Sequence, residues 1–309
     1  MYDCIIIGAG PAGLSAGLYA ARSSMNTLII EKQVPGGLIA KTDEIANYPG
    51  TGEALTGPNL IKKMVEQVKL FGANITTDTV VDVDFSTKVK KIICKKQTYE
   101  TKSVIIATGS NPRLLNVPGE KEFTGKGVCY CATCDAPFFE GLDVYVVGAG
   151  EAAVEEAMYL TKFARKVTLL VRKDKLSVAK SIEEKALKCE KLSIMWNVEV
   201  EKFEGEGLLN SMTLINNKTK ETKIIVPKNG DMIFGVFIFI GYLPETSIFE
   251  NKLEISKGYI VADERMKTSV DGVFVAGDVR VKELRQVVTA VNDGAIAAVN
   301  AGKYVESLD

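Results

Sequence analysis

Gly8-Ala9-Gly10-Pro11-Ala12-Gly13 directly follows the apolar run Tyr2 to Ile7 and opens the helical pattern Leu14 to Ser23. This is the order of a strand, a tight turn and a helix. Gly8 permits the turn, Gly10 lets backbone N–H groups approach a pyrophosphate, and Gly13 lets the helix pack closely on the strand. The stretch therefore predicts an α/β unit that binds a dinucleotide.

An acid supports this interpretation. Glu31 ends the next predicted strand, Thr27 to Ile30. A carboxylate about 20 residues beyond the glycines is placed to accept hydrogen bonds from a ribose diol. A lone glycine triad often marks only a tight turn, whereas strand, helix and acid in register indicate dinucleotide binding.

The chain then continues through loop, helix and strands. Residues Val34 to Gly57 are rich in Gly, Pro, Asn and Thr, which predicts a long irregular loop that is either a surface excursion or the wrapping of a flavin ring. An amphipathic helix is expected over Leu60 to Phe71, and strands from Ile75 to Val104. The buried strand from Ser103 enters a small-residue turn at Thr108 and Gly109 and returns the chain to the cofactor.

The strand-turn-helix unit occurs a second time. Val144 to Val147 is followed by Gly148-Ala149-Gly150-Glu151-Ala152-Ala153 and by a predicted helix, Val154 to Phe163. Ala153 replaces the third glycine. The next strand leads into Arg172-Lys173 with no acid, which favours the 2′-phosphate of NADPH, unless these residues are a solvated charge run.

Between the two glycine loops lies Cys131-Ala132-Thr133-Cys134-Asp135. Two cysteines at this spacing can cycle between dithiol and disulfide in one tight loop. Two dinucleotide loops around such a pair imply an electron relay. Asp135 is a candidate general acid, because burial can raise the pKa of a carboxyl towards neutrality; the alternative is a turn-stabilising Asx residue.

The C-terminal part repeats the pattern of a strand before a helix. Val273 to Ala276 is an apolar strand that ends in Gly277-Asp278, and an Ala-rich helix is expected over Val287 to Ala301. Asp278 can hydrogen-bond a ribityl hydroxyl or act as a simple helix cap.

Composition limits the function classes. The chain has 309 residues, which suits two lobes, and a net charge of -1 with scattered Lys and Arg, so a nucleic-acid surface is not expected. Histidine is absent, which excludes imidazole bases and most zinc catalysis. The longest apolar run, Met232 to Leu243, is short of the roughly 20 residues that span a bilayer and predicts a buried strand.

The cysteines are mostly isolated, so no disulfide framework is expected, and with no leader pattern at Met1 we expect a cytoplasmic protein. Cys129, with Cys189 as a further ligand, raises the possibility of a metal site, but the spacing matches no ordinary zinc site. Cys4, Cys94 and Cys189 are expected to be small core residues in strands or helices.

The order of GAGPAG, ATG, CATCD, GAGEAA and VFVAGD resembles the low-molecular-weight thioredoxin reductases, class II of the FAD-containing pyridine nucleotide-disulfide oxidoreductases. The resemblance covers essentially the full chain. It implies two Rossmann-like, doubly wound α/β domains, the second inserted into a discontinuous first. Residues 1–114 and 246–309 would bind FAD, and residues 115–245 would bind NAD(P) and carry the dithiol. Family members are homodimers, and a first hinge is expected near Asn111 to Pro118.

The resemblance also implies site residues. FAD would contact Gly8, Gly10, Ala12, Gly13, Glu31, Gly37, Asn47, Thr108, Gly109, Gly277, Asp278, Arg285, Gln286 and Val287. The nicotinamide cofactor would contact Gly148, Gly150, Ala153, Arg172 and Lys173. The catalytic residues would be Cys131, which attacks the disulfide of thioredoxin, Cys134 on the flavin side, and Asp135 as the acid that protonates the leaving thiolate.

The chain departs from the family pattern at several positions. Leu38 stands where the flavin loop usually has Gln, and Glu151 where the second loop usually has Asn, Asp or Ser. In the phosphate clamp, Lys173 replaces an arginine and Ser177 the last basic residue. Lysine lacks the bidentate fork of arginine, so NADH or reduced ferredoxin are alternative donors to NADPH.

The expected function is therefore a flavoprotein that passes electrons from NADPH through FAD and the Cys131–Cys134 disulfide to thioredoxin. The alternative is a non-enzymatic redox sensor, in which oxidation of the cysteine pair alters partner binding. A sensor would not need the second dinucleotide unit. No metal, nucleic acid or membrane enters this expectation.

Overall fold

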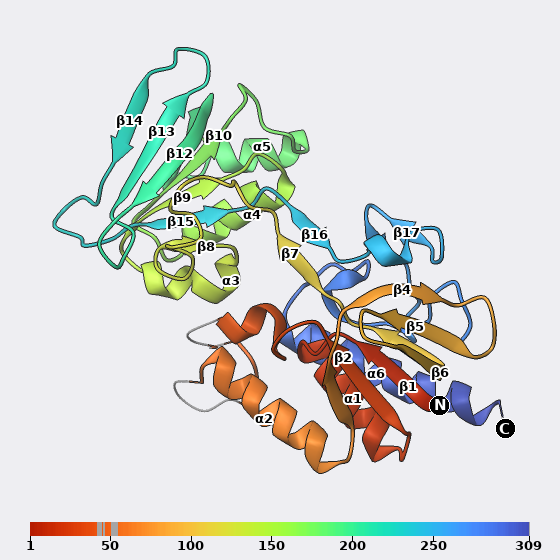
Figure 1. The fold of residues 1–309 in the computed structure, drawn as a ribbon. Coiled ribbons are helices and arrows are strands. Elements are labelled where there is room, and N and C mark those ends of the chain that lie inside the picture. The colour runs from red at the N-terminus through yellow and green to blue at the C-terminus, as the bar shows by residue number, and fades with distance from the viewer. Residues whose placement is uncertain (42–44, 46, 51–54, 309) are drawn as a thin grey trace. The chain divides into compact units, whose positions relative to one another are not determined.

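The computed structural model describes residues 1–41, 45, 47–50 and 55–308. By its contacts the chain divides into two compact units (Figure 1): Met1–Asn111 with Leu243–Asp309, and Pro112–Tyr242 between them. The second unit is thus inserted into a discontinuous first, as expected. The segments that join the units contain the short paired strands β7 (Ser110–Pro112) and β16 (Tyr242–Pro244).

The first unit is built on a mixed sheet. Its elements are β1 (Tyr2–Ile7), α1 (Pro11–Arg22), β2 (Thr27–Glu31), η1 (Gly37–Lys41), α2 (Gly57–Leu70), β3 (Asn74–Thr77), β4 (Val80–Asp84), β5 (Lys90–Cys94), β6 (Thr98–Ile106), η3 (Ser247–Phe249), β17 (Ile255–Ser256), β18 (Tyr259–Ile260), β19 (Val273–Val275), η4 (Gly277–Val279) and α6 (Val287–Glu306). Within the described residues, seven strands form one sheet in the order β3-β2-β1-β6-β5-β4, with β19 also paired to β6. β1 is parallel to both β2 and β6.

The second unit is built on a parallel sheet. Its elements are β8 (Val128–Cys129), α3 (Ala132–Asp135), η2 (Ala136–Phe139), β9 (Asp143–Val147), α4 (Glu151–Leu160), β10 (Lys166–Val171), α5 (Lys180–Leu187), β11 (Leu192–Trp196), β12 (Val198–Glu204), β13 (Ser211–Asn216), β14 (Thr222–Ile225) and β15 (Gly235–Ile238). The parallel strands run in the order β11-β10-β9-β15-β8, and β12, β13 and β14 form a separate antiparallel sheet.

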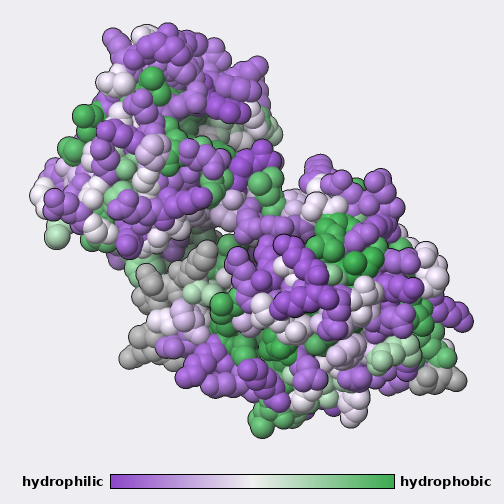
Figure 2. All heavy atoms as spheres, in the orientation of Figure 1, coloured by the Kyte–Doolittle hydropathy of each residue, from purple (hydrophilic) through white to green (hydrophobic). Residues whose placement is uncertain are grey.

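Within the described residues, the α-helices cover one face of each main sheet, so the units are Rossmann-like but not doubly wound. In the first unit, α1 and α6 pack together over one face, where Ile6 and Ile105 are fully buried. On the other face Ile5 and Ile106 pack with side chains such as Phe249. In the second unit the face opposite α4 is covered by the antiparallel strands β12 to β14. The side facing the viewer in Figure 2 is largely hydrophilic, as expected when apolar side chains fill these cores.

Most of the predicted elements are confirmed, with shifted ends. Both helices after the glycine loops begin earlier than predicted, α1 at Pro11 and α4 at Glu151, and α4 also ends earlier, at Leu160. The first helical turn tolerates proline, because a backbone N–H at that position would have no partner within the helix. An acid in the first turn interacts favourably with the positive end of the helix dipole. The final helix, α6, continues five residues beyond the predicted Ala301, to Glu306.

Other outcomes concern the loop, the apolar run and the cysteines. Part of the predicted long loop (42–44, 46 and 51–54) lies outside the described residues, and the remainder contains η1. The predicted buried strand in the apolar run is β15, which is fully buried. Cys4 and Cys94 are buried in strands as expected. The expectation for Cys189 is wrong, because it is half-buried and follows the end of α5 at Leu187.

Candidate active site

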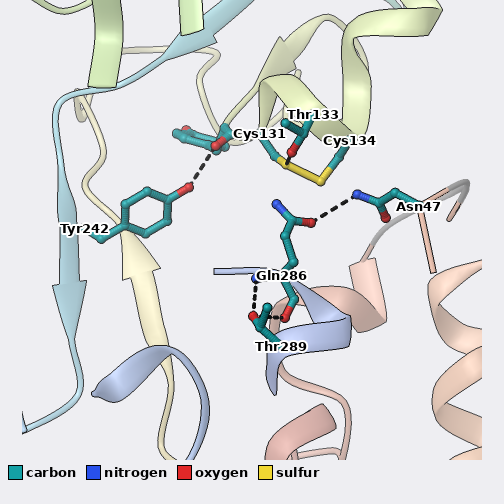
Figure 3. Close-up of a disulfide and its surroundings, with 8 residues drawn as sticks. Asn47, Cys131, Thr133, Cys134, Tyr242, Gln286 and Thr289 are labelled. Carbon is teal, nitrogen blue, oxygen red and sulfur yellow. Dashed lines mark hydrogen bonds between the residues drawn. A yellow bond between two sulfur atoms is a disulfide. The ribbon is translucent and has the colours of Figure 1, made fainter. Parts of the chain in front are cut away.

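The cysteine pair lies in the tight connection between β8 and η2, at helix α3. Cys131 is the N-cap of this single turn and Cys134 lies within it. The two form a disulfide, and their Cα atoms are 5.3 Å apart (Figure 3). Both are half-buried, and the Thr133 hydroxyl oxygen lies 3.4 Å from the sulfur of Cys131. The pair predicted from the spacing is therefore closed as a disulfide and is partly exposed.

Asp135 ends the same helical turn, and its side chain faces a third cysteine. Burial raises the pKa of Asp135, a hydrogen bond with the thiol of Cys129 offsets part of this rise, and the resulting pKa is about 6. Burial, together with the charge of Asp135, raises the pKa of Cys129 well above its ordinary value, so Cys129 is a thiol at neutral pH. In the described part of the chain the Asp135 side chain makes no capping hydrogen bond to η2, which the Asx alternative would need.

The first glycine loop is held by its own unit. The backbone N–H of Ala9 donates to the Glu31 carboxylate at 2.8 Å, and the N–H of Gly36 donates to the carbonyl of Ala9 at 2.8 Å. A Cβ on Gly37 would lie 3.6 Å from the Cα of Gly10. The loop, the acid and the start of the predicted flavin loop are therefore brought together around β1 and β2.

The C-terminal segment reaches the same loop. A Cβ on Gly277 would lie 2.8 Å from the Cβ of Ala12, and a Cβ on Gly8 would lie 2.4 Å from the carbonyl oxygen of Ala107. Thr108 and Gly109 follow at once, and the Thr108 hydroxyl donates to the carbonyl of Glu245 at 2.8 Å. Hence the residues expected around the first cofactor come from both sequence segments of the unit.

Two polar atoms in this segment favour a bound polar ligand. Among the described residues, Oδ1 of Asp278 and Nε of Arg285 are buried without a hydrogen-bond partner. The guanidinium of Arg285 also lies over the ring of Tyr259, 4.2 Å from its centroid. Buried polar groups are rarely left unpaired, so an acceptor and a donor at these positions fit the hydroxyl and phosphate groups of a dinucleotide such as FAD.

The start of α6 is fixed by its cap. The Gln286 side chain and Thr289 form a reciprocal capping box, which places Val287 at the first helical position. The Asn47 side-chain amide donates to the side-chain oxygen of Gln286 at 3.1 Å (Figure 3). Two residues that are 239 positions apart in the sequence therefore meet at this cap.

The second glycine loop has the geometry of the first. Gly148 has a φ of +154°, and a Cβ there would lie 2.5 Å from the Cβ of Ala153, so the loop turns tightly onto α4. Ser177 contacts this loop, because its N–H donates to the carbonyl of Ala149 at 2.7 Å. Arg172 and Lys173 follow β10 with exposed side chains, which are open to an anionic ligand.

Sequence reasoning missed a buried group near the dithiol. Glu120 is 1% exposed and accepts a hydrogen bond from the hydroxyl of Tyr130 at 2.8 Å. The hydroxyl of Tyr242 donates to the carbonyl of Tyr130 at 2.9 Å (Figure 3). No pattern in the sequence links these residues, which are up to 122 positions apart in the chain.

A metal site at Cys129 would require several ligands close together. Within the described residues, no group of three or more His, Cys, Asp or Glu side chains is arranged to hold a metal ion.

The helices of the described part of the chain are too short or too polar to cross a bilayer.

Comparisons with known proteins give a consistent result. The model of the pyridine nucleotide-disulphide oxidoreductase family matches residues 2–294. The chain is 55% identical over 309 residues to the thioredoxin reductase of Peptoclostridium litorale, covering 100% of this chain and 98% of the relative. It is 44% identical over 310 residues to that of Bacillus subtilis, covering 100% and 96%. The crystal structure of thioredoxin reductase from Streptococcus pyogenes superimposes with a TM-score of 0.94 at 41% identity, covering 99% of both chains.

Proposed function

Because the chain belongs to the pyridine nucleotide-disulphide oxidoreductase family, we propose that it is a flavoprotein thioredoxin reductase. The observation that carries the proposal is the Cys131–Cys134 disulfide, half-buried in an α/β unit that also contains the second glycine loop. FAD, when bound, would supply the transfer of electrons from a reduced pyridine nucleotide to this disulfide. The alternative of a non-enzymatic sensor is not favoured, since the relatives are named as reductases.

The proposal assigns FAD to the first unit. The loop Gly8 to Gly13 would hold its pyrophosphate, Glu31 its ribose, and Asp278 and Arg285 would supply the buried acceptor and donor atoms. The cysteine pair stays in the other unit. The domain limits 1–114, 115–245 and 246–309, a homodimeric state and a cytoplasmic location are parts of the same proposal.

The proposed donor is NADPH, held by Gly148, Gly150 and Ala153 with Arg172 and Lys173 at the 2′-phosphate. The exposed basic side chains support this choice, whereas Glu151 in the first turn of α4 and the contact of Ser177 with the loop weaken it. Anaerobic titration with NADPH, NADH and reduced ferredoxin, while the flavin absorption is followed, tests the choice. Rapid bleaching by NADPH supports it, and bleaching only by NADH or ferredoxin overturns it.

Replacing both basic residues tests the phosphate contact directly. Arg172→Ala with Lys173→Ala is expected to lower the preference for NADPH over NADH by roughly 10- to 100-fold, because charge-assisted hydrogen bonds contribute about 1.5–3 kcal/mol. The measurement is kcat/KM for each nucleotide. Lys175→Ala is the matched control, an exposed lysine of the same loop. An unchanged ratio in the double variant would show that the two residues are only a solvated charge run.

Asp135 is proposed as the acid that protonates the thiolate released during exchange with thioredoxin. Because its pKa is raised to about 6, its protonated fraction falls as the pH rises through 6. Asp135→Asn is therefore expected to slow thioredoxin reduction about 100-fold. The variant should also lose the decrease in rate that the wild type shows above pH 6. Rates between pH 5 and 8, compared with the separately measured reduction of FAD, provide the check. FAD reduction should be retained, and an unchanged thioredoxin rate would reject the role.

A further inference from the structure

The residue that precedes the dithiol is held at both its backbone and its side chain. The carbonyl oxygen of Tyr130 accepts a hydrogen bond from the Tyr242 hydroxyl at 2.9 Å, and its own hydroxyl donates to Oε1 of Glu120 at 2.8 Å. Burial, followed by the hydrogen bond and charge of Glu120, raises the pKa of Tyr130, so this hydroxyl keeps its proton and remains a donor.

Glu120 is itself fixed. Its Oε1 accepts the backbone N–H of Leu115 at 2.8 Å, and its Oε2 accepts that of Asn116 at 2.7 Å. A carboxylate that is 1% exposed is costly to bury unless such donors satisfy it, which gives the three donors a well-defined geometry. The Glu120 carboxylate therefore joins the Tyr130 side chain to the segment that follows Pro112.

Both anchors come from the places where the chain enters and leaves the inserted unit. Pro112 is the first residue of that unit, with Leu115 and Asn116 just behind it, and Tyr242 is its last residue. On its other side Tyr130 is preceded by Cys129, which is paired with Phe237 in the parallel sheet. Three contacts thus restrain the chain at Tyr130: the pairing of Cys129 in the sheet, the hydrogen bond to Glu120 and the hydrogen bond from Tyr242.

This restraint passes to Cys131 through one peptide group. The carbonyl of Tyr130 and the nitrogen and Cα of Cys131 lie in the same planar unit, so a hydrogen bond to that carbonyl limits rotation of the whole group. The Cα–Cβ bond of Cys131 starts at the Cα atom that ends this planar peptide group. The α3 turn then fixes the other sulfur, since the N–H of Asp135 donates to the carbonyl of Cys131 at 3.1 Å.

We propose that Tyr242 and Glu120 are positioning residues that act through Tyr130 to hold Cys131 in the orientation from which it closes the disulfide with Cys134. The proposal deepens the proposed function and rests on it for the role of the pair. Closure oxidises the two thiols to one disulfide, with loss of two protons and two electrons to an oxidant, here oxidised dithiothreitol. Loss of the restraint lowers the effective concentration of one thiol at the other and so favours the dithiol.

Removal of single hydroxyl groups tests this. Tyr242→Phe and Tyr130→Phe are each expected to lower the equilibrium constant for closure about fivefold, which raises the reduction potential by about 20 mV. The flavin-loaded protein is equilibrated in buffers of reduced and oxidised dithiothreitol and quenched in acid. Denaturation, alkylation and mass spectrometry of the Cys131–Cys134 peptide then give the fraction of dithiol. The assay uses neither thioredoxin nor a pyridine nucleotide, so it stands even where the proposed activity fails.

Tyr159→Phe is the matched control, because Tyr159 lies in α4 of the same unit, near the end away from the glycine loop. A raised potential in Tyr242→Phe and Tyr130→Phe, with Tyr159→Phe like the wild type, supports the proposal. An unchanged reduction potential in both test variants overturns the proposal. This holds even if thermal unfolding shows that the variants are less stable, because lower stability with an unchanged potential indicates a structural role alone. An equal shift in Tyr159→Phe overturns it as well.

Discussion

Cys134→Ser is expected to abolish thioredoxin-dependent turnover, with a loss of roughly 1000-fold or more, while leaving the fold and the bound flavin intact. Cys131 and Cys134 form the disulfide at α3, and a lone thiol can neither store two electrons as a dithiol nor release a bound partner by closing an intramolecular bond. Both side chains are half-buried at the short helix α3, so we expect the hydroxyl of serine to replace the thiol without a change of packing. Turnover is measured with excess thioredoxin and pyridine nucleotide.

The same variant separates the roles of the two sulfurs. The probe is a thioredoxin that keeps one active-site cysteine, activated as its mixed disulfide with thionitrobenzoate. A free Cys131 thiolate in Cys134→Ser displaces thionitrobenzoate and forms a stable mixed disulfide with the probe. Cys131→Ser is expected to react much more slowly if Cys134 serves the flavin side. Cys189→Ser, which removes a half-buried thiol elsewhere in the unit, serves as the control. Equal reaction of the two single variants would reverse the assigned order.

The glycine loops show which parts of the fold can be predicted from the sequence. A strand that ends in glycine and is followed at once by a helix leaves few alternatives, because Gly8 has a φ of +105° and lies against the backbone of Ala107. Local residue patterns carry that information. For the same reason Cys131 and Cys134 could be paired by their spacing alone, since three residues along one turn keep their Cα atoms 5.3 Å apart.

Features that depend on distant contacts were not predictable in this way. The strand β12 alternates apolar and charged residues, but no local pattern in β12, β13 or β14 indicates that they cover the face of the sheet opposite α4. Glu120 resembles any surface acid in the sequence, and its burial is possible only because Leu115, Asn116 and Tyr130 direct donors at it. The hydrogen bond of Asp135 with Cys129 likewise exists only once β8 and α3 lie together. Side-chain partners of this kind follow from the assembled fold.

Gly13→Ala is expected to yield a protein that is unstable and lacks flavin. A Cβ at this position would lie 1.9 Å from the carbonyl oxygen of Gly8 and 2.9 Å from its carbon, and both atoms belong to backbone that the turn holds in place. Helix α1 would have to move away from β1. Overpacking of this type costs about 3 kcal/mol or more in free energy of unfolding, which urea titration measures, and the flavin content of the purified protein should fall with it.

Gly10→Ala should separate folding from cofactor binding. A Cβ on Gly10 would have no atom of the described residues outside its chain neighbours within 4 Å, and its φ of −73° suits alanine. Its free energy of unfolding without cofactor should fall by less than about 1 kcal/mol, since alanine is only a poorer N-cap for α1. The methyl group occupies the surface proposed for the pyrophosphate, so FAD should dissociate at least about tenfold more readily, equivalent to about 1.4 kcal/mol. An unchanged affinity of Gly10→Ala for FAD would place the pyrophosphate elsewhere. A Gly13→Ala variant that is as stable as the wild type would show that close packing of α1 does not constrain the loop.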